Sequence, residues 1–168
     1  MKIKKFMAMM IAAVALSLGF ASCDDDDDDD APVPSKVSLA TSLAGDYTGE
    51  YSLTVSTSTS TDTVTYSIKK IDDTHVSLTT PSAGSGAMAL PSITIDNIPV
   101  SSTTVAGSEV ISGSVASVAG SIVVNDVEKA YTFTDLVIAN TGNKVSIAYS
   151  LQYGKMPMAM VCSFVGEK

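Results

Sequence analysis

The chain has 168 residues and a formal net charge of −8 at pH 7, and its 10 basic residues are all lysines. An acidic chain without arginine has no basic patch and no bidentate phosphate contacts, so we expect no nucleic-acid partner. One histidine and two cysteines are too few for the usual protein metal sites, and we expect no metal and no other cofactor.

Residues 1–22 have the order of a bacterial lipoprotein signal peptide. Lysines begin the segment, an uncharged stretch runs from Phe6 to Phe20, and small residues precede Cys23. The uncharged stretch is too short and too diluted by serine and glycine to span a bilayer, which takes about 20 apolar residues. Cys23 resembles a lipobox cysteine, which is acylated and becomes the new N-terminus. Ordinary secretion with cleavage near Ala21 is the alternative.

Residues 23–38 are predicted to be the lipidated cysteine and a disordered tether rich in aspartate and proline. Aspartates bury no apolar surface and repel one another, so the run suits a solvated spacer. It also resembles the acidic signal that follows the lipidated cysteine in surface lipoproteins of Bacteroidota. That resemblance implies an outer membrane lipoprotein facing the cell exterior. The candidate export signal comprises Asp24, Asp25, Asp26, Asp27, Asp28, Asp29 and Asp30.

Residues 39–168 are predicted to form one all-β domain, because apolar and polar residues alternate and no stretch keeps a helical period. Short antiparallel strands at this spacing favour a barrel of about eight strands, with a sandwich as the alternative. Nine candidate segments, some of them fused or broken, are Asp46–Ser56, Asp62–Ile71, His75–Thr80, Ser92–Val100, Ser108–Val118, Ser121–Val127, Ala130–Ala139, Lys144–Tyr153 and Met156–Val165.

Three segments of this domain have a composition more typical of other structure. Ser56–Thr61 and Ser101–Thr104 consist mainly of serine and threonine and are expected to be exposed loops. Residues 105–120 contain mostly alanine, glycine, serine and valine, and a short helix is the alternative to a strand there.

The clearest alternation lies at the C-terminal end of the domain. From Lys144 to Tyr153, and again from Met156 to Phe164, apolar residues recur at every second position. Gly154-Lys155 between the two strands fits a two-residue hairpin turn. Cys162 falls in the inward set and, as the only thiol left beside a lipidated Cys23, is expected to be a small buried core residue.

Two motifs resemble a known family. The segments Leu43–Tyr51 (Leu-Ala-Gly-Asp-Tyr-Thr-Gly-Glu-Tyr) and Leu90–Val100, with the closing strands, are similar to the calycin-like β-barrel domain of Bacteroidota lipoproteins. The similarity covers roughly residues 40–167. It implies an eight-stranded antiparallel barrel of lipocalin-like shape, in a family whose activity is largely undefined.

The chain departs from the lipocalin pattern at the barrel base. Gly45-Asp46-Tyr47 stands where a lipocalin has Gly-x-Trp, whose tryptophan closes the base and packs under an arginine from the last strand. Tyr47 could close the base, but the chain has no arginine to stack on it. This difference weakens any transfer of lipocalin ligand chemistry.

Methionines at alternate positions of the last strand are the main candidates for a ligand site. Methionine fills irregular cores and also lines adaptable binding surfaces. An eight-stranded barrel can be filled by its own side chains or can hold one small ligand, so both interpretations stay open. The candidate lining residues are Met156, Met158, Met160, Ile147, Leu151 and Tyr149.

No catalytic constellation is visible, and we expect a protein that is not an enzyme. His75 lies beside Asp72 and Asp73, but these residues fit a turn between strands and no nucleophile elbow accompanies them. Asp46 and Glu50 have no second carboxylate placed to make an acid–base pair. Asp62-Thr63-Val64 is similar to the O-glycosylation pattern of exported Bacteroidota proteins, which makes Thr63 a candidate for modification.

Together these features predict a lipid-anchored cell-envelope protein with a non-catalytic binding domain. Its partners are expected to be the membrane, through the lipid, and a small apolar or amphipathic ligand. The alternative is a structural or adhesive envelope protein that contacts a protein or a glycan through its loops, with a filled barrel or a sandwich.

Overall fold

The structure is a computed structural model that describes residues 37–84 and 89–168. This part of the chain contains one short helix, α1 (Leu39–Leu43), and eight strands. The strands are β1 (Gly45–Val55), β2 (Ser58–Lys70), β3 (His75–Thr79), β4 (Thr94–Val105), β5 (Ser108–Val124), β6 (Val127–Thr141), β7 (Lys144–Tyr153) and β8 (Met160–Glu167). No helix among the described residues combines the length and the hydropathy needed to cross a membrane.

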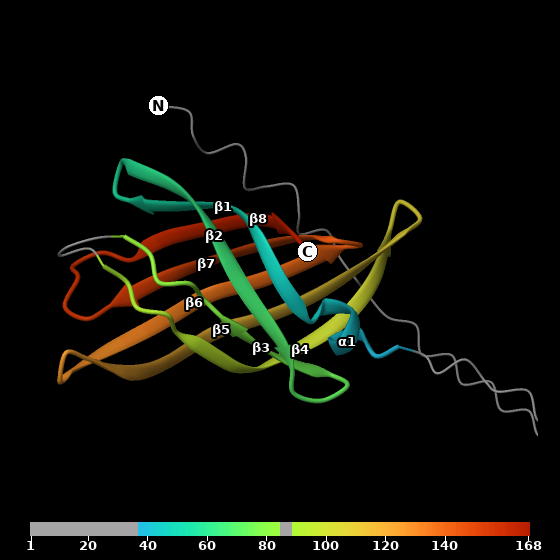
Figure 1. Ribbon diagram of the computed structural model, residues 1–168, viewed down its shortest axis with the longest axis horizontal. Coiled ribbons are helices and arrows are strands. Elements are labelled where there is room, and N and C mark those ends of the chain that lie inside the picture. The colour runs from blue at the N-terminus through green and yellow to red at the C-terminus, as the bar shows by residue number, and fades with distance from the viewer. Residues whose placement is uncertain (1–36, 85–88) are drawn as a thin grey trace, which may run out of the picture. The chain divides into compact units, whose positions relative to one another are not determined.

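The eight strands form one closed antiparallel barrel (Figure 1). Each strand pairs with the next along the chain, and β1 also pairs with β8, so the ring closes in sequence order. This confirms the predicted all-β barrel. It excludes the sandwich, because the closed ring leaves no edge strand unpaired.

Two glycines allow the closing strands to approach each other. Gly49 of β1 lies directly opposite Gly166 of β8. A Cβ atom on Gly49 would collide with the carbonyl oxygen of Val165. A Cβ atom on Gly166 would collide with the Phe164 ring and lie 2.9 Å from the carbonyl oxygen of Thr48. The seam between β1 and β8 therefore requires residues without side chains.

One end of the barrel, which we call the base, is formed by α1, the start of β1, the β6–β7 turn and the end of β8. Tyr47 is fully buried there, and its hydroxyl donates a hydrogen bond to the Leu43 carbonyl at 2.7 Å. Asn140 Nδ2 donates to the Tyr47 hydroxyl at 3.3 Å. The Lys168 ammonium lies 5.2 Å from the centroid of the Tyr47 ring. Tyr47 thus closes the base under Lys168, a lysine where the lipocalin pattern has an arginine.

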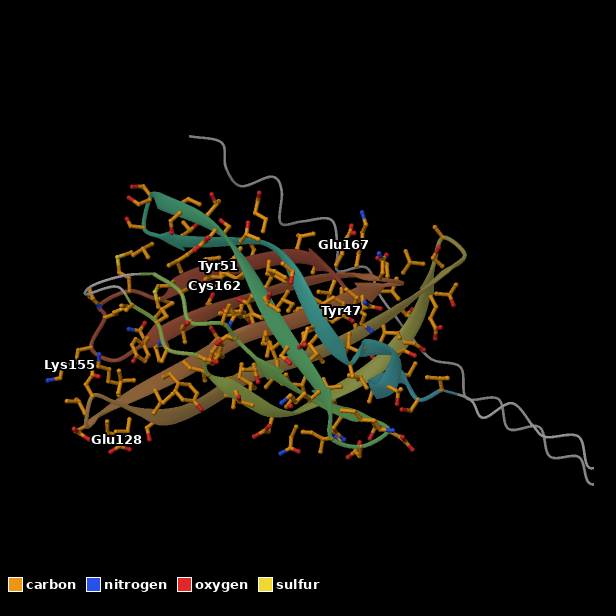
Figure 2. All side chains as sticks on the ribbon, viewed as in Figure 1. Tyr47, Tyr51, Glu128, Lys155, Cys162 and Glu167 are labelled. Carbon is orange, nitrogen blue, oxygen red and sulfur yellow. The ribbon has the colours of Figure 1, made fainter. Side chains whose placement is uncertain are left out.

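The middle of the barrel is filled by its own side chains. Tyr66 and Tyr149 share a hydrogen bond of 2.8 Å, and the rings of Tyr66 and Phe164 have centroids 4.5 Å apart. The Tyr51 hydroxyl donates to Cys162 Sγ at 3.3 Å, and Figure 2 shows these two residues side by side. Cys162 is buried in the core, as the alternation predicted. The interior at this level is therefore packed core.

The strands extend further than the sequence predicted. Ser101–Thr104 belongs to β4 and residues 58–61 belong to β2, so the predicted loops are wrong at these positions. Residues 108–124 form the single strand β5, which fuses two candidate segments and excludes the short helix. These parts of the hairpins are largely exposed, so polar and small residues occupy positions where an inner strand would alternate. Such a composition resembles that of a loop.

The connection between β7 and β8 is also longer than predicted. It runs through residues 154–159, and β8 begins only at Met160. Pro157 lies in this connection and has no backbone N–H for a ladder hydrogen bond. The predicted two-residue turn at Gly154-Lys155 is therefore wrong. The longer connection contributes to the end of the barrel opposite the base, which we call the mouth.

Candidate functional site

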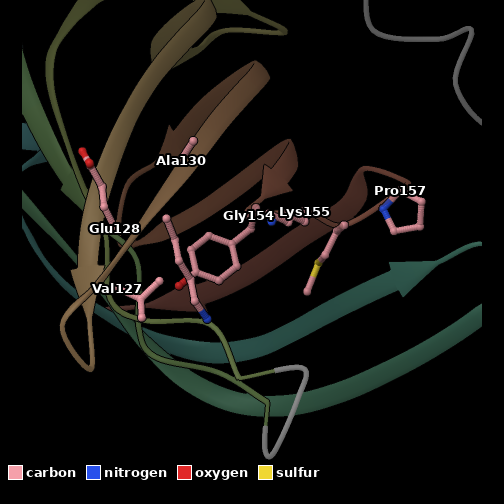
Figure 3. A pocket seen from close by; sticks show the side chains of 9 residues that line it. Val127, Glu128, Ala130, Gly154, Lys155 and Pro157 are labelled. Atoms are coloured by element: carbon pink, nitrogen blue, oxygen red, sulfur yellow. The ribbon is translucent and has the colours of Figure 1, made fainter.

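A pocket of about 710 Å³ lies at the mouth of the barrel. Its size falls within the range of roughly 300–1,000 Å³ that is typical of small-molecule sites. One wall comes from the start of β6 and the other from the end of β7 and the connection after it (Figure 3). The lining residues are Val127, Glu128, Lys129, Ala130, Tyr153, Gly154, Lys155, Met156 and Pro157.

Backbone contacts hold the two walls together. The Gly154 N–H donates to the Ala130 carbonyl at 2.7 Å, which ties the connection to β6. The Met156 N–H donates to the Tyr153 carbonyl at 3.3 Å, and the Gln152 side-chain amide donates to the Met156 carbonyl. Three bonds thus fix the segment from Tyr153 to Met156, so the walls of the pocket are preformed.

Tyr153 has an unusual environment for a buried tyrosine. Its side chain is only 3% exposed, and no other described residue makes a hydrogen bond to its hydroxyl. Burial raises the pKa of Tyr153 above its ordinary value of 10.0, which already keeps the hydroxyl protonated at neutral pH, so the hydroxyl is a donor. Most buried hydroxyls in proteins have a partner, because leaving one unpaired is costly. Tyr153 is therefore the polar group of this pocket that a bound molecule could satisfy.

The charges around the pocket are arranged asymmetrically. The Lys129 ammonium lies 5.5 Å from the centroid of the Tyr153 ring, within the range of a cation–π contact. Glu128 accepts a hydrogen bond of 2.6 Å from the Ser121 hydroxyl, and Figure 3 shows its carboxylate pointing away from Lys155 and Pro157. The positive charge of Lys129 is thus beside Tyr153, while the nearest lining acid is engaged elsewhere.

The structure separates the three methionines of the predicted stripe. Met156 lines the pocket, Met158 is 50% exposed, and Met160 is fully buried in the core. The inward orientation predicted for Met158 is wrong, because β8 starts only at Met160 and the connection before it does not follow strand periodicity. From Met160 to Gly166 the alternation holds.

The other candidate lining residues lie deeper. Ile147, Tyr149 and Leu151 are buried in the packed core and are not among the residues that line the mouth pocket. Burial, followed by the proximity of the neighbouring Tyr66, raises the pKa of Tyr149 well above its usual value. The structure thus brings only Met156 of the candidate set to the pocket.

Sequence reasoning missed Tyr153 and Lys129, two of the polar residues that line the pocket. Tyr153 continues the inward set of β7 after Leu151, so the alternation contained the signal for its orientation. Lys129 lies two positions before Tyr131, which pairs with Tyr153 across the ladder. This pairing joins positions of the chain that no local pattern connects, which is why the pocket was not predicted.

The acidic turn beside His75 is a hydrogen-bonded turn. Asp72 accepts from the Thr74 backbone N–H at 2.7 Å, and this bond is the main reason that the pKa of Asp72 falls to about 2. His75 Nδ1 lies 3.1 Å from both Asp72 oxygens, and Lys70 pairs with Asp73 at 2.5 Å. Local bonds thus account for each charged group of the turn.

The remaining candidates are scattered. Thr63 is exposed and lies in β2, whereas Asp46 and Glu50 are exposed on β1. In residues 37–84 and 89–168, no three acidic, histidine or cysteine side chains are grouped as metal ligands. Cys23 and the aspartates from Asp24 to Asp30 lie outside the described residues.

Comparisons with known proteins agree with the barrel geometry. The model of the calycin-like β-barrel domain matches residues 43–167. A crystal structure of a protein from Bacteroides fragilis NCTC 9343, provisionally named an outer membrane protein, is similar with a TM-score of 0.55 and 23% identity. The match covers 79% of this chain and 53% of that protein, so the chain spans about half its length. At this identity the likeness concerns the fold alone. No curated protein matches the chain.

Proposed function

This chain belongs to the calycin-like β-barrel domain family, and we propose that it acts by binding and not by catalysis. The proposed ligand is a small apolar or amphipathic molecule, and the proposed site is the mouth pocket. The observation that carries the proposal is a pocket of about 710 Å³ whose lining combines aliphatic side chains with a buried tyrosine hydroxyl that has no hydrogen-bond partner among the described residues. Pockets of this size and composition are typical ligand sites.

The proposal locates the ligand at the mouth and not in the middle of the barrel. The middle of the interior is occupied by aromatic side chains: Tyr66 hydrogen-bonds to Tyr149 and packs against Phe164. These side chains fill the space that a ligand would need there. Met156 connects the two regions, because it lines the pocket and also packs against the core. A flexible thioether at that position can adapt to ligands of different shape.

A fluorescence assay tests the site directly. N-phenylnaphthylamine is a neutral apolar probe whose fluorescence emission rises in apolar surroundings. We expect the purified full-length protein to increase the emission of this probe. Met156→Trp puts a larger side chain into the pocket and should reduce probe binding by about tenfold, since the added ring competes for the space. Met158→Trp is the matched control, because Met158 is half exposed and does not line the pocket. Equal binding by both variants would place the ligand elsewhere.

We also propose that the protein is exported and held at the outer membrane by a lipid on Cys23. The signal-like segment before Cys23 supports this, as does the name of the similar Bacteroides fragilis protein. Several acyl chains hold a protein far more firmly than one, since each buried methylene contributes roughly 0.8 kcal/mol. Cys23→Ser should therefore release the protein from membranes, and mass spectrometry should show the loss of the acyl mass. A membrane-bound, unacylated variant would contradict the anchor.

Surface exposure is a separate part of the proposal and rests on the aspartate run. Protease added to intact cells should digest the domain without lysis. Replacement of Asp24 to Asp30 by asparagine should protect it, because the acidic character of the signal is lost while Cys23 is kept. Digestion of the unchanged protein only after lysis would show that the domain faces the periplasm.

A second candidate function has its own structural support. The packed middle of the barrel and the exposed serine- and threonine-rich hairpins fit a structural or adhesive protein that contacts a protein or a glycan. The two hypotheses separate in the probe assay. No probe binding by the unchanged protein would favour the adhesive function and direct mutagenesis to the hairpins.

A further inference from the structure

We propose that the mouth pocket selects amphiphiles with an anionic head group, which accepts a hydrogen bond from the Tyr153 hydroxyl beside the Lys129 ammonium. This inference rests on the proposed binding function and names its ligand class. It predicts a preference for carboxylate-type heads over neutral and cationic heads on the same hydrocarbon chain.

The first argument concerns the Tyr153 hydroxyl. A phenolic hydroxyl donates one hydrogen bond, and the described residues offer this one no acceptor. The chain nevertheless keeps a tyrosine at a position that is 3% exposed, where a phenylalanine would bury the same ring without an unpaired oxygen. A ligand atom that accepts a hydrogen bond from this hydroxyl removes the cost of burying it without an acceptor. The Tyr153 hydroxyl is therefore suited to a head group with an available acceptor.

The second argument concerns charge. The Lys129 ammonium lies over the same ring, at 5.5 Å from its centroid, and has donors but no acceptor. The carboxylate of Glu128 is held by Ser121 at 2.6 Å and does not neutralise the pocket from within. Two neighbouring donors, one of them charged, favour a group that only accepts, such as a carboxylate.

The third argument concerns the rest of the lining. Val127, Ala130, Met156 and Pro157 supply aliphatic surface on both walls. Val127 is also 56% exposed, so apolar surface continues from the pocket to the edge of the mouth. An apolar tail can contact this surface while its head stays near Tyr153. The pocket therefore fits an amphiphile better than a small polar anion such as free phosphate.

Calorimetric titration of the full-length protein tests the inference with three probes below their micelle-forming concentrations. The probes are dodecanoate, dodecanol and dodecyltrimethylammonium, which share a chain and differ in head group. We expect dodecanoate to bind at least tenfold more tightly than dodecyltrimethylammonium, since a charge-assisted hydrogen bond is worth about that factor. Inorganic phosphate alone should not bind measurably.

Two substitutions assign the effect to the proposed residues. Tyr153→Phe and Lys129→Gln should each weaken dodecanoate about tenfold, because each removes one donor. Binding of dodecyltrimethylammonium, which accepts no hydrogen bond, should be unchanged by Tyr153→Phe and unchanged or tighter with Lys129→Gln. Tyr131→Phe and Lys69→Gln are the matched controls, since neither residue lines the pocket.

The possible outcomes separate the two levels of proposal. If all three probes bind with equal affinity, or if Tyr153→Phe leaves dodecanoate binding unchanged, the head-group preference is wrong while the proposed binding function stands. If none of the probes binds to the unchanged protein, the proposed function fails as well. Circular dichroism of each variant confirms that it is folded, so that lost binding is not mistaken for lost structure.

Discussion

The Lys168 ammonium lies 5.2 Å from the centroid of the Tyr47 ring, although the two residues stand at opposite ends of the barrel domain in sequence. Lys168 Nζ also donates to the Ser42 carbonyl at 2.9 Å, and its backbone N–H donates to the Asn143 carbonyl at 3.0 Å. Lys168 therefore connects α1, β1 and the β6–β7 turn. In a lipocalin an arginine stacks on the base tryptophan, and here a lysine stacks on a tyrosine.

This contact predicts a selective effect of Lys168 on stability. Lys168→Met removes the charge and the bond to Ser42, so the free energy of unfolding should fall by about 1 kcal/mol. Lys168→Arg should keep most of the stability, because the guanidinium can stack on Tyr47 and still donate. Urea unfolding followed by circular dichroism measures both. A loss as large in the arginine variant as in the methionine variant would contradict a cation-dependent contact.

The buried tyrosines predict a loss of stability at alkaline pH. Burial raises the pKa of Tyr47 from 10.0 to about 12. Burial also raises the pKa values of Tyr51, Tyr66 and Tyr149. A group whose pKa is higher in the folded than in the unfolded state contributes its full stabilisation at a pH below the unfolded pKa. This stabilisation of the folded state is lost as the pH rises from the unfolded pKa through the folded pKa. Burial also raises the pKa of the Cys162 thiol from 9.0. The urea midpoint should therefore be steady below pH 9.0 and fall as the pH rises through 10.0 to about 12.

Ultraviolet absorbance of tyrosinate checks the same window by an independent signal. In the folded protein the buried Tyr47, Tyr51, Tyr66 and Tyr149 should ionise only together with unfolding, because burial disfavours their charged forms. A urea midpoint that stays constant across the window would rule out a folded state that keeps these hydroxyls neutral.

Met160 and Met158 should differ strongly in how much their replacement by alanine lowers stability. Met160→Ala should lower the free energy of unfolding by about 2–5 kcal/mol, because it leaves a cavity in a packed core. Met158→Ala should change it by no more than about 0.5 kcal/mol, since Met158 is half exposed and precedes β8. Thermal and urea unfolding of the two variants test this. Equal effects would mean that the alternation extends through the connection after all.

The closing seam predicts an effect of a single methyl group. Gly49→Ala should lower the free energy of unfolding by about 1–3 kcal/mol, because the added Cβ collides with the Val165 carbonyl across the seam. Gly107→Ala is a control for loss of a glycine, since no atom lies within 4 Å of a Cβ there, although its φ of +82° adds some backbone strain. Hydrogen exchange should locate the Gly49→Ala effect at β1 and β8. Protection unchanged at both strands would argue against a tight seam.

Much of the fold could be predicted because alternation is a local property of the chain. Ile147 and Leu151 of β7 face the core as their spacing indicated, and Lys144–Tyr153 has the predicted bounds. The errors occurred where composition no longer reports burial. In the exposed hairpins, Ser101–Thr104 stays in a ladder although both of its faces contact water.

The candidate site could be predicted only in part. Met156 was identified by its residue type, and it lines the pocket. Tyr153 and Lys129 were not identified, because an unpaired hydroxyl and a nearby cation become visible only when β6 and β7 are in register. Sequence patterns show which face a residue takes and do not show which partner it lacks.

The all-β class, the inward faces of the main strands and the signal-like segment before Cys23 could all be recognised from neighbours along the chain. Three features became visible only in the folded barrel: Lys168 covers Tyr47, Gly49 lies opposite Gly166, and β6 and the connection after β7 line a pocket. The physical reason is that barrel closure and strand register bring distant residues together. Contacts between them depend on that geometry and not on local propensity.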